Sequence, residues 1–168
     1  MAKIGNFRPI NDFDWNHPTK VDRLGIEDLF SLEFVEKNRN VVLAGPQGLG
    51  KTLIARNLAH HAANKGFTVF TTTASQLVID LSSAESSAAL TRKLRRYTKP
   101  RVLVIDEVGY LNFDHKSADL IFEIVSRRYE KGTIILTTNS AFKDWGSFFP
   151  GAPCVTAMID RLTHHCDI

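Results

Sequence analysis

The chain has 168 residues and a net charge of +3, and 43% of its residues are hydrophobic, which is typical of one globular domain. No segment approaches the roughly 20 apolar residues that span a bilayer, and the amino-terminal stretch MAKIGNFRPINDFDW lacks the apolar core of a signal peptide, so we expect a cytoplasmic protein with no membrane partner. The two cysteines, Cys154 and Cys166, are too few for a disulfide framework and lack the paired spacing of a zinc site, so we expect reduced thiols.

Hydrophobic spacing along the chain predicts alternating helices and strands. Residues 1–22 show little periodicity, and their aromatic residues predict an irregular arm packed on a domain formed by residues 23–168. Helical spacing predicts helices over about residues 25–37, 52–65, 74–97 (broken near 82–87) and 117–131. Short apolar runs predict strands at residues 41–45, 67–72, 102–105 and 133–136. We therefore expect an α/β fold, a parallel sheet flanked by helices on both faces, with ligands at the carboxyl ends of the strands.

The segment GPQGLGKT lies between a predicted strand and a predicted helix and matches the P-loop pattern. Glycines let the backbone wrap closely enough for several N–H groups to point at a phosphate, and the helix adds its positive amino-terminal end. Lys51 can reach the outer phosphates, and Thr52 can bind magnesium. A glycine-rich turn without a ligand is the alternative, which the strand-to-helix context disfavours. The predicted nucleotide-binding residues are Gly45, Pro46, Gln47, Gly48, Leu49, Gly50, Lys51, Thr52 and Leu53.

Polar residues follow two further predicted strands. In RVLVIDEVGYL, Asp106 and Glu107 come at the end of an apolar run. Asp106 is suited to hold magnesium, and Glu107 to polarise the water that attacks the terminal phosphate, so hydrolysis is favoured over nucleotide storage. In TIILTTNS, Asn139 follows Thr137 and Thr138, beside the acid pair in a parallel sheet. Asn139 could orient the attacking water, although such residues also form ordinary turns.

Positive charge is concentrated in the run TRKLRRYTKPR, which contains no acidic residue. Its candidate DNA-binding residues are Arg92, Lys93, Arg95, Arg96 and Lys99, which could contact phosphates, although a solvated helix face is the alternative. A second candidate cluster contains Arg127, Arg128 and Lys131. The segment HHCD at residues 164–167 offers metal-ligand types, but we expect a helix packed on the core, because consecutive helical residues point in different directions.

With these motifs in place, the chain resembles the ATPase domain of the AAA+ superfamily. More narrowly, it resembles the IstB-like transposition helper proteins and the related DnaC-type helicase loaders. The resemblance spans about residues 13–166 and is carried by GPQGLGKT, FTTTASQL, LVIDEVGYL, ADLIFEIVSRRYEKGTIILTTN, FKDWGSFFP and MIDRLTHHC. The first motif is shared by a vast class of proteins, whereas IDEVGYL followed by SRRYEKGTIILTTN and WG is far more specific.

This resemblance implies an ATPase with ATP and magnesium as cofactors, which forms a homo-oligomer on DNA and delivers or regulates a transposase. It also implies that Arg161, in the DRL segment, reaches the ATP site of a neighbouring subunit as an arginine finger; an ion pair with Asp160 is the alternative. Proteins of this kind carry a further amino-terminal domain and a helical tail after that segment. Because the match ends near Ile168, we expect the carboxyl-terminal lid to be absent or truncated.

Three other functions are compatible with the same motifs. A loader of a replicative helicase uses the same ATP-switched assembly, so its partner would be a helicase instead of a transposase. A small-molecule kinase would need an acceptor pocket and a mobile basic lid, neither of which the sequence reveals. A nucleotide-dependent binding module would keep the P-loop but turn over little ATP.

Overall fold

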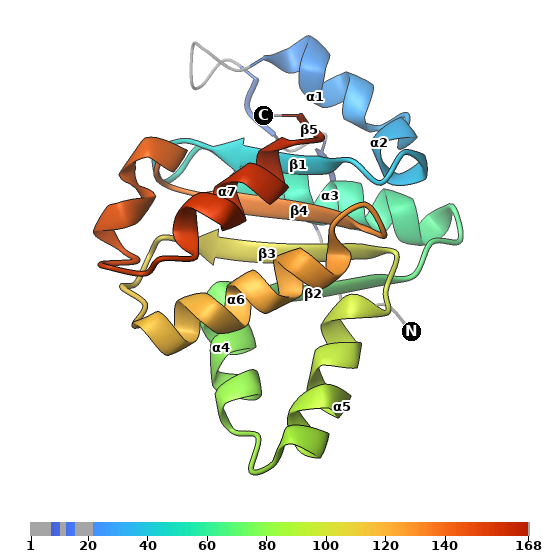
Figure 1. Cartoon of the computed structure of the whole chain (residues 1–168). Helices are drawn as coiled ribbons and strands as arrows, with labels where there is room; N and C mark the ends of the chain where they lie inside the picture. The colour runs from blue at the N-terminus through green and yellow to red at the C-terminus, as the bar shows by residue number, and fades with distance from the viewer. Residues whose placement is uncertain (1–7, 11–12, 16–21, 168) are drawn as a thin grey trace.

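The computed structural model describes residues 8–10, 13–15 and 22–167. At its centre lies a sheet in which every pair of neighbouring strands is parallel, in the order β2-β3-β4-β1-β5 (Figure 1). The strands are β1 (Asn40–Ala44), β2 (Val69–Thr73), β3 (Val102–Val108), β4 (Thr133–Thr138) and β5 (Cys166–Asp167). Because β4 separates β1 from β3, residues at the ends of β1 and β3 can meet only across the end of β4.

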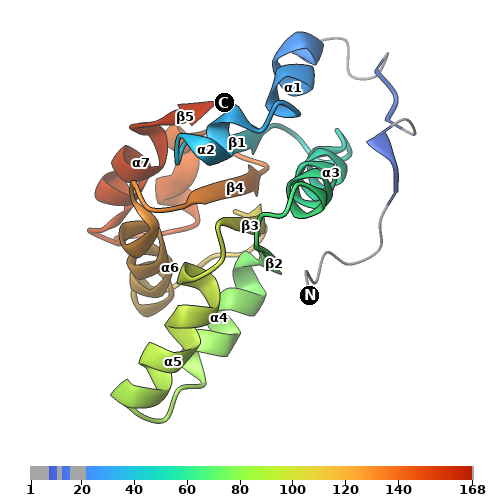
Figure 2. The same ribbon diagram turned by 90° about the vertical axis from the view of Figure 1, so that its right-hand side faces the viewer.

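Helices cover both faces of the sheet, which confirms the predicted αβα arrangement (Figure 2). One face carries α1 (Arg23–Leu29), α2 (Glu33–Glu36) and α3 (Lys51–Asn64). The other side carries α4 (Ala74–Ser82), α5 (Ser87–Thr98), α6 (His115–Arg128), the 3₁₀ helix η2 (Phe142–Ser147) and α7 (Val155–Thr163). No helix among the described residues is both long enough and apolar enough to cross a membrane.

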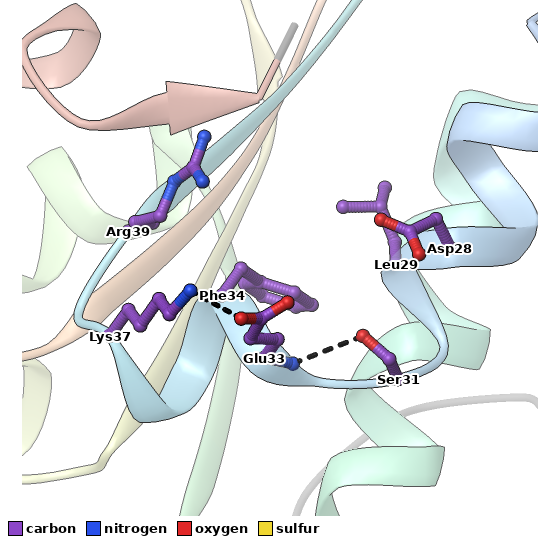
Figure 3. Close-up of a pocket in the computed structure, with 7 residues that line it drawn as sticks. All are labelled: Asp28, Leu29, Ser31, Glu33, Phe34, Lys37 and Arg39. Atoms are coloured by element: carbon purple, nitrogen blue, oxygen red, sulfur yellow. Dashed lines mark hydrogen bonds and ion pairs between the residues drawn. The ribbon is translucent and has the colours of Figure 1, made fainter.

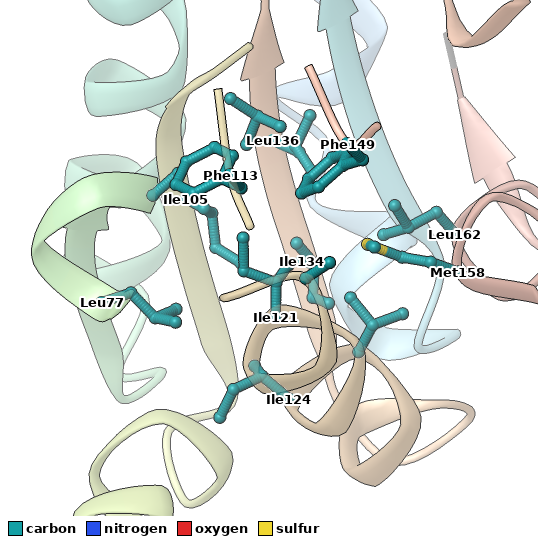
Figure 4. Packing of buried hydrophobic residues seen from close by; sticks show 14 of the residues in the cluster. Leu77, Ile105, Phe113, Ile121, Ile124, Ile134, Leu136, Phe149, Met158 and Leu162 are labelled. Carbon is teal, nitrogen blue, oxygen red and sulfur yellow. The ribbon is translucent and has the colours of Figure 1, made fainter. Parts of the chain in front are cut away.

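The core consists of two hydrophobic clusters, one on each face of the sheet. Side chains of β3 alternate between them: Leu103 and Ile105 face the cluster under α4, α6 and α7, whereas Val104 faces the cluster under α3. Figure 4 shows Ile105 and its neighbours packed against residues of α6 and α7. Burial on both faces explains why the central strands read as uninterrupted apolar runs.

Local capping explains where several helices begin. The predicted break near residues 82–87 is confirmed, and the Ser86 side chain accepts a hydrogen bond from the N–H of Ala89 at the start of α5. In the same way, Asp114 accepts a bond from the N–H of Ser117, so α6 begins at His115, slightly earlier than its apolar spacing predicts.

Two expectations of secondary structure are wrong. The single helix expected over residues 25–37 is two helices, because Leu32 between them adopts a left-handed backbone with a φ of 61° while its side chain is buried. The segment LTHHC was expected to be helical throughout, but α7 ends at Thr163. Cys166 then pairs with Asn40 in β5, and the N–H of Asn40 donates to the carbonyl of His165 at 2.8 Å. Pairing with an open sheet edge overrides the helical spacing there.

Candidate nucleotide-binding site

The P-loop connects the end of β1 to the first turn of α3. Gly48 and Gly50 have φ values of 80° and 79°, in the left-handed region that glycine adopts without steric cost. The N–H of Gly45 donates to the carbonyl of Thr138 at 3.2 Å, so the start of the loop is held against the end of β4. The loop is therefore a tight turn with a fixed position on the sheet.

Lys51 lies folded against its own loop. Its Nζ atom donates to the carbonyl oxygen of Pro46 at 2.6 Å, and the residue is only 9% exposed. Burial lowers the pKa of the Lys51 ammonium, an effect that Asp106 partly opposes by favouring the charged form. The cation therefore lies where an anion on the loop would relieve its desolvation.

Asp106 joins the P-loop helix to the centre of the sheet. It is 6% exposed, and its Oδ1 atom accepts hydrogen bonds from Thr52 Oγ1 at 2.9 Å and from Thr137 Oγ1. The two residues that the sequence selects for magnesium, Thr52 and Asp106, are thus brought into direct contact across the end of β4. This contact places the acid pair at the same end of the sheet as the P-loop.

Glu107 has a strained backbone and an exposed side chain. Its φ is 64°, which costs a residue with a Cβ atom roughly 1–2 kcal/mol. The register of β3 against β4 shifts between Ile105 and Val108, and Glu107 lies in that irregularity. Such strain is retained where the surroundings enforce it, as at functional sites.

Asn139 follows β4 and lies beside the loop after the acid pair. A Cβ atom placed on Gly109 would lie 2.9 Å from Asn139 Oδ1, so the two residues are in close contact. Ser140 Oγ donates to the same oxygen at 3.1 Å. The Asn139 amide therefore contacts Gly109, which follows Glu107 by two residues in the chain. This contact lies at the end of the sheet that also holds the P-loop.

Comparison with known proteins agrees with this geometry. All of residues 1–168 match the family described as IstB-like ATP binding protein. The chain belongs to this family. It is 39% identical over 165 residues to the ATP-binding protein of insertion sequence IS5376 from Geobacillus stearothermophilus, covering 98% of this chain and 66% of that protein. It is 38% identical over 165 residues to the ATP-binding protein of insertion sequence IS21 from Pseudomonas aeruginosa, covering 98% of this chain and 62% of that protein.

The IstB-like chain thus spans slightly less than two thirds of the length of these two relatives. Its fold is also that of a solved structure, the DnaC helicase loader, with a TM-score of 0.72 and 21% identity over 86% of this chain and 84% of that one. This likeness confirms the predicted fold, a parallel sheet flanked by helices.

The structure places Arg161 of this IstB-like chain away from the P-loop. Arg161 lies on α7, across the sheet from α3 (Figure 2). Its guanidinium donates to Ser126 Oγ and lies 4.7 Å from the centre of the Phe122 ring, so it packs on α6. Among the described residues, Arg161 makes no ion pair with Asp160, so that alternative is wrong.

The basic run forms the exposed surface of α5, which projects with α4 beyond the sheet (Figure 1). Lys93 donates to the carbonyl of Asp80 at 2.6 Å, and Arg96 lies 3.6 Å from the Asp80 carboxylate and 4.9 Å from the Phe70 ring centre. Two of the five candidates are thus engaged within the domain. The other three are exposed and form no ion pair with any described residue; they are Arg92, Arg95 and Lys99.

The second basic cluster is only partly on the surface: Arg127 and Lys131 are exposed, but Arg128 is only 1% exposed. Its guanidinium donates to five main-chain carbonyls, those of Tyr97, Thr98, Pro100, Arg101 and Thr133. Burial lowers the pKa of Arg128 to about 10. Arg127 is exposed but pairs with Glu123 at 2.5 Å. The expectation of a phosphate contact from Arg128 is therefore wrong; the residue joins α6 to the end of α5, to the segment between α5 and β3 and to the start of β4.

A shallow pocket lies between α1 and α2, ahead of β1 and at the opposite end of that strand from the P-loop (Figure 3). Figure 3 shows Glu33 paired with Lys37 inside it. No predicted site residue lines this pocket; the lining residues are Asp28, Leu29, Ser31, Glu33, Phe34, Lys37 and Arg39. Glu33 and Lys37 already pair with each other, so we assign the pocket no ligand.

Sequence reasoning missed two contacts of the site. Thr137 binds both residues of the acid pair, although the pattern TTN marks it only as a polar neighbour. Phe13, in the predicted arm, packs on the P-loop: a Cβ atom on Gly50 would lie 2.4 Å from its ring. The described residues of the arm thus include one that contacts the phosphate loop, which no periodicity in residues 1–22 could indicate.

Proposed function

We propose that this chain is the ATPase core of a DNA-transposition helper. The core binds and hydrolyses ATP, assembles with further copies on DNA, and delivers or regulates a transposase. The observation that carries this function is the 2.9 Å contact between Thr52 of the P-loop helix and Asp106 at the end of β3. Membership of the IstB-like family, with relatives encoded by insertion sequences, supports ATP binding in a transposition setting.

The site residues divide into phosphate, metal and water contacts. The P-loop amides and Lys51 bind the phosphates, and Thr52 and Asp106 hold magnesium. Their hydroxyl and carboxylate oxygens are the donors that magnesium prefers, so the residues present fit the ion. When bound there, the ion would neutralise charge on the phosphates. The exposed carboxylate of Glu107 orients and deprotonates the attacking water, and Asn139 positions that water.

The position of Arg161 supports the proposed self-assembly. Because α7 and α3 lie on opposite faces of the sheet, Arg161 serves the nucleotide of a neighbouring copy instead of its own. A solitary subunit would then lack one cation of its site. DNA binding is assigned to the exposed cations of α5, which contact phosphates with little dependence on base sequence.

Phosphate release is the direct test. We expect the protein to release phosphate from ATP without any acceptor molecule, and duplex DNA to increase the rate. Lys51→Ala should abolish nucleotide binding, whereas Lys65→Ala, an exposed lysine just after the same helix, should leave it unchanged. Nucleotide binding that survives Lys51→Ala would contradict the assignment, and phosphate transfer only to a small acceptor would indicate a kinase.

Loading of a replicative helicase is the second candidate, because the fold matches the DnaC helicase loader over 84% of that chain. Both functions use the same ATPase core, so only the partner separates them. Capture of purified transposase, with purified replicative helicase as the control, distinguishes the two. Nucleotide binding without measurable phosphate release, with or without DNA, would instead indicate a binding module.

A further inference from the structure

The hydroxyl of Thr137 contacts both residues of the acid pair at once. Thr137 lies near the end of β4 and is 1% exposed. Its Oγ1 atom donates to Asp106 Oδ1 and accepts the main-chain N–H of Glu107 at 2.9 Å. A hydroxyl has one proton and two lone pairs, so it can make both bonds simultaneously, whereas an apolar side chain can make neither.

We propose that Thr137 is a positioning residue of the ATPase site, which fixes the carboxylate of Asp106 and the backbone of Glu107 relative to each other. This role rests on the proposed function, because it assumes that Asp106 serves magnesium and Glu107 serves water. Thr137 touches neither nucleotide nor water in this scheme. It acts only through the two acids.

The contact with Asp106 restricts the carboxylate that is assigned to magnesium. Asp106 Oδ1 accepts two hydroxyl donors, from Thr52 and Thr137. A metal ion at Thr52 would take a lone pair of Oγ1 and leave the hydroxyl proton free to donate to Asp106, so both bonds to the carboxylate could persist. Thr137, which donates from β4, thereby restricts rotation of the carboxylate together with Thr52 of α3. It is suited to this because a β-branched side chain on a buried central strand has little rotational freedom.

The contact with Glu107 replaces a missing ladder bond. The register shift between β3 and β4 interrupts regular pairing between Ile105 and Val108. Glu107, within that interval, has a φ of 64°, which residues with a Cβ atom rarely adopt. Its N–H finds a partner in the Thr137 hydroxyl instead of a strand carbonyl. The same bond therefore satisfies a main-chain donor and holds Glu107 in the conformation that exposes its carboxylate.

The next residue provides a matched control. Thr138 is also on β4 and also 1% exposed. Its Oγ1 atom, however, exchanges hydrogen bonds of 3.2 Å with the main chain of Ser140 and contacts neither acid. Thr137→Val and Thr138→Val remove the same hydroxyl from adjacent buried positions, so only their different partners separate the two changes.

The test measures affinity for a fluorescent ATP analogue with and without magnesium, together with the rate of phosphate release and the melting temperature. For Thr137→Val we expect the magnesium concentration at half-saturation to rise and turnover to fall by roughly 10- to 100-fold, as for loss of an outer-shell metal partner. Affinity without magnesium should stay within about twofold, because the P-loop amides and Lys51 are untouched. Thr137→Ser should recover most of the lost magnesium affinity and turnover, and Thr138→Val should resemble wild type.

Two results would overturn the role of Thr137: an unchanged magnesium dependence in Thr137→Val, or equal losses in Thr137→Val and Thr138→Val. If Thr137→Val does not fold, Thr137→Ala also removes the hydroxyl, and wild-type magnesium dependence and turnover of that variant would overturn the role too. Failure of the proposed function is recognised separately, because the wild-type protein would then bind no nucleotide or show no effect of magnesium.

Discussion

Replacing three exposed cations of α5 should selectively weaken the salt dependence of DNA binding. The change is Arg92→Gln, Arg95→Gln and Lys99→Gln together. These residues lie at positions i, i+3 and i+7, so they line one side of the helix and its carboxyl-terminal cap. Lys93 and Arg96 are left in place because Asp80 engages both. The variant therefore removes surface charge while keeping the internal contacts of the α4–α5 hairpin.

The expected magnitude follows from counterion release. Each phosphate that a cation neutralises contributes about 0.9 to the slope of log affinity against log salt, so three contacts contribute about 2.7. Between about 50 and 200 mM salt, a fourfold increase, this slope corresponds to about 40-fold in affinity. The variant should thus bind more weakly than wild type at low salt, and the two affinities should converge as salt increases.

Fluorescence anisotropy with two labelled duplexes of unrelated sequence, over a salt series and with an ATP analogue present, measures both slopes. The control variant carries Arg23→Gln, Lys37→Gln and Lys65→Gln, which remove the same charge from exposed positions outside the hairpin. A slope for the α5 variant that stays within about 0.5 of wild type would refute the assignment, because it is less than one phosphate contact. An equal decrease in the control would indicate an effect of net charge alone.

Three further predictions concern stability and assembly. Arg128→Met should lower the free energy of unfolding by at least about 3 kcal/mol and the melting temperature by about 6–12 °C, because it leaves buried carbonyls unpaired. Arg127→Met should lower the free energy of unfolding by less than about 0.5 kcal/mol. Equal losses for the two variants on urea unfolding would contradict the role of Arg128. The pKa of Asp80 is lowered, chiefly by the Tyr97 hydroxyl and then by Lys93 and Arg96. The stabilisation from the Asp80 carboxylate is therefore present above its pKa in the unfolded chain, near 3.8, and is lost as pH falls through its lower pKa in the folded protein. Asp80→Asn should thus flatten the acid limb of a curve of unfolding free energy against pH. Arg161→Ala should abolish any rise in ATPase rate per subunit with protein concentration while leaving nucleotide affinity unchanged, and a rise that persists would exclude the arginine-finger role.

Local sequence determined the order of the main elements and the phosphate loop. Glycines at positions 48 and 50 are required by left-handed backbone angles within a single turn, so the pattern around Lys51 predicts its own conformation. The central strands are buried on both faces, as their uninterrupted apolar runs predict. Asp106 could be placed near the P-loop because the carboxyl ends of parallel strands share one edge of the sheet.

Tertiary structure alone decided which similar residues have which partners. Arg127 and Arg128 are neighbours in one basic cluster, yet one is exposed and the other is buried and donates to five main-chain carbonyls. Thr137 and Thr138 are equally buried, yet only Thr137 reaches the acid pair, because the irregularity in β3 turns the N–H of Glu107 toward it. Periodicity along a chain indicates which face a side chain occupies. It carries no information about the distant segment that the face meets, because that contact depends on how strands and helices from separate parts of the chain pack together.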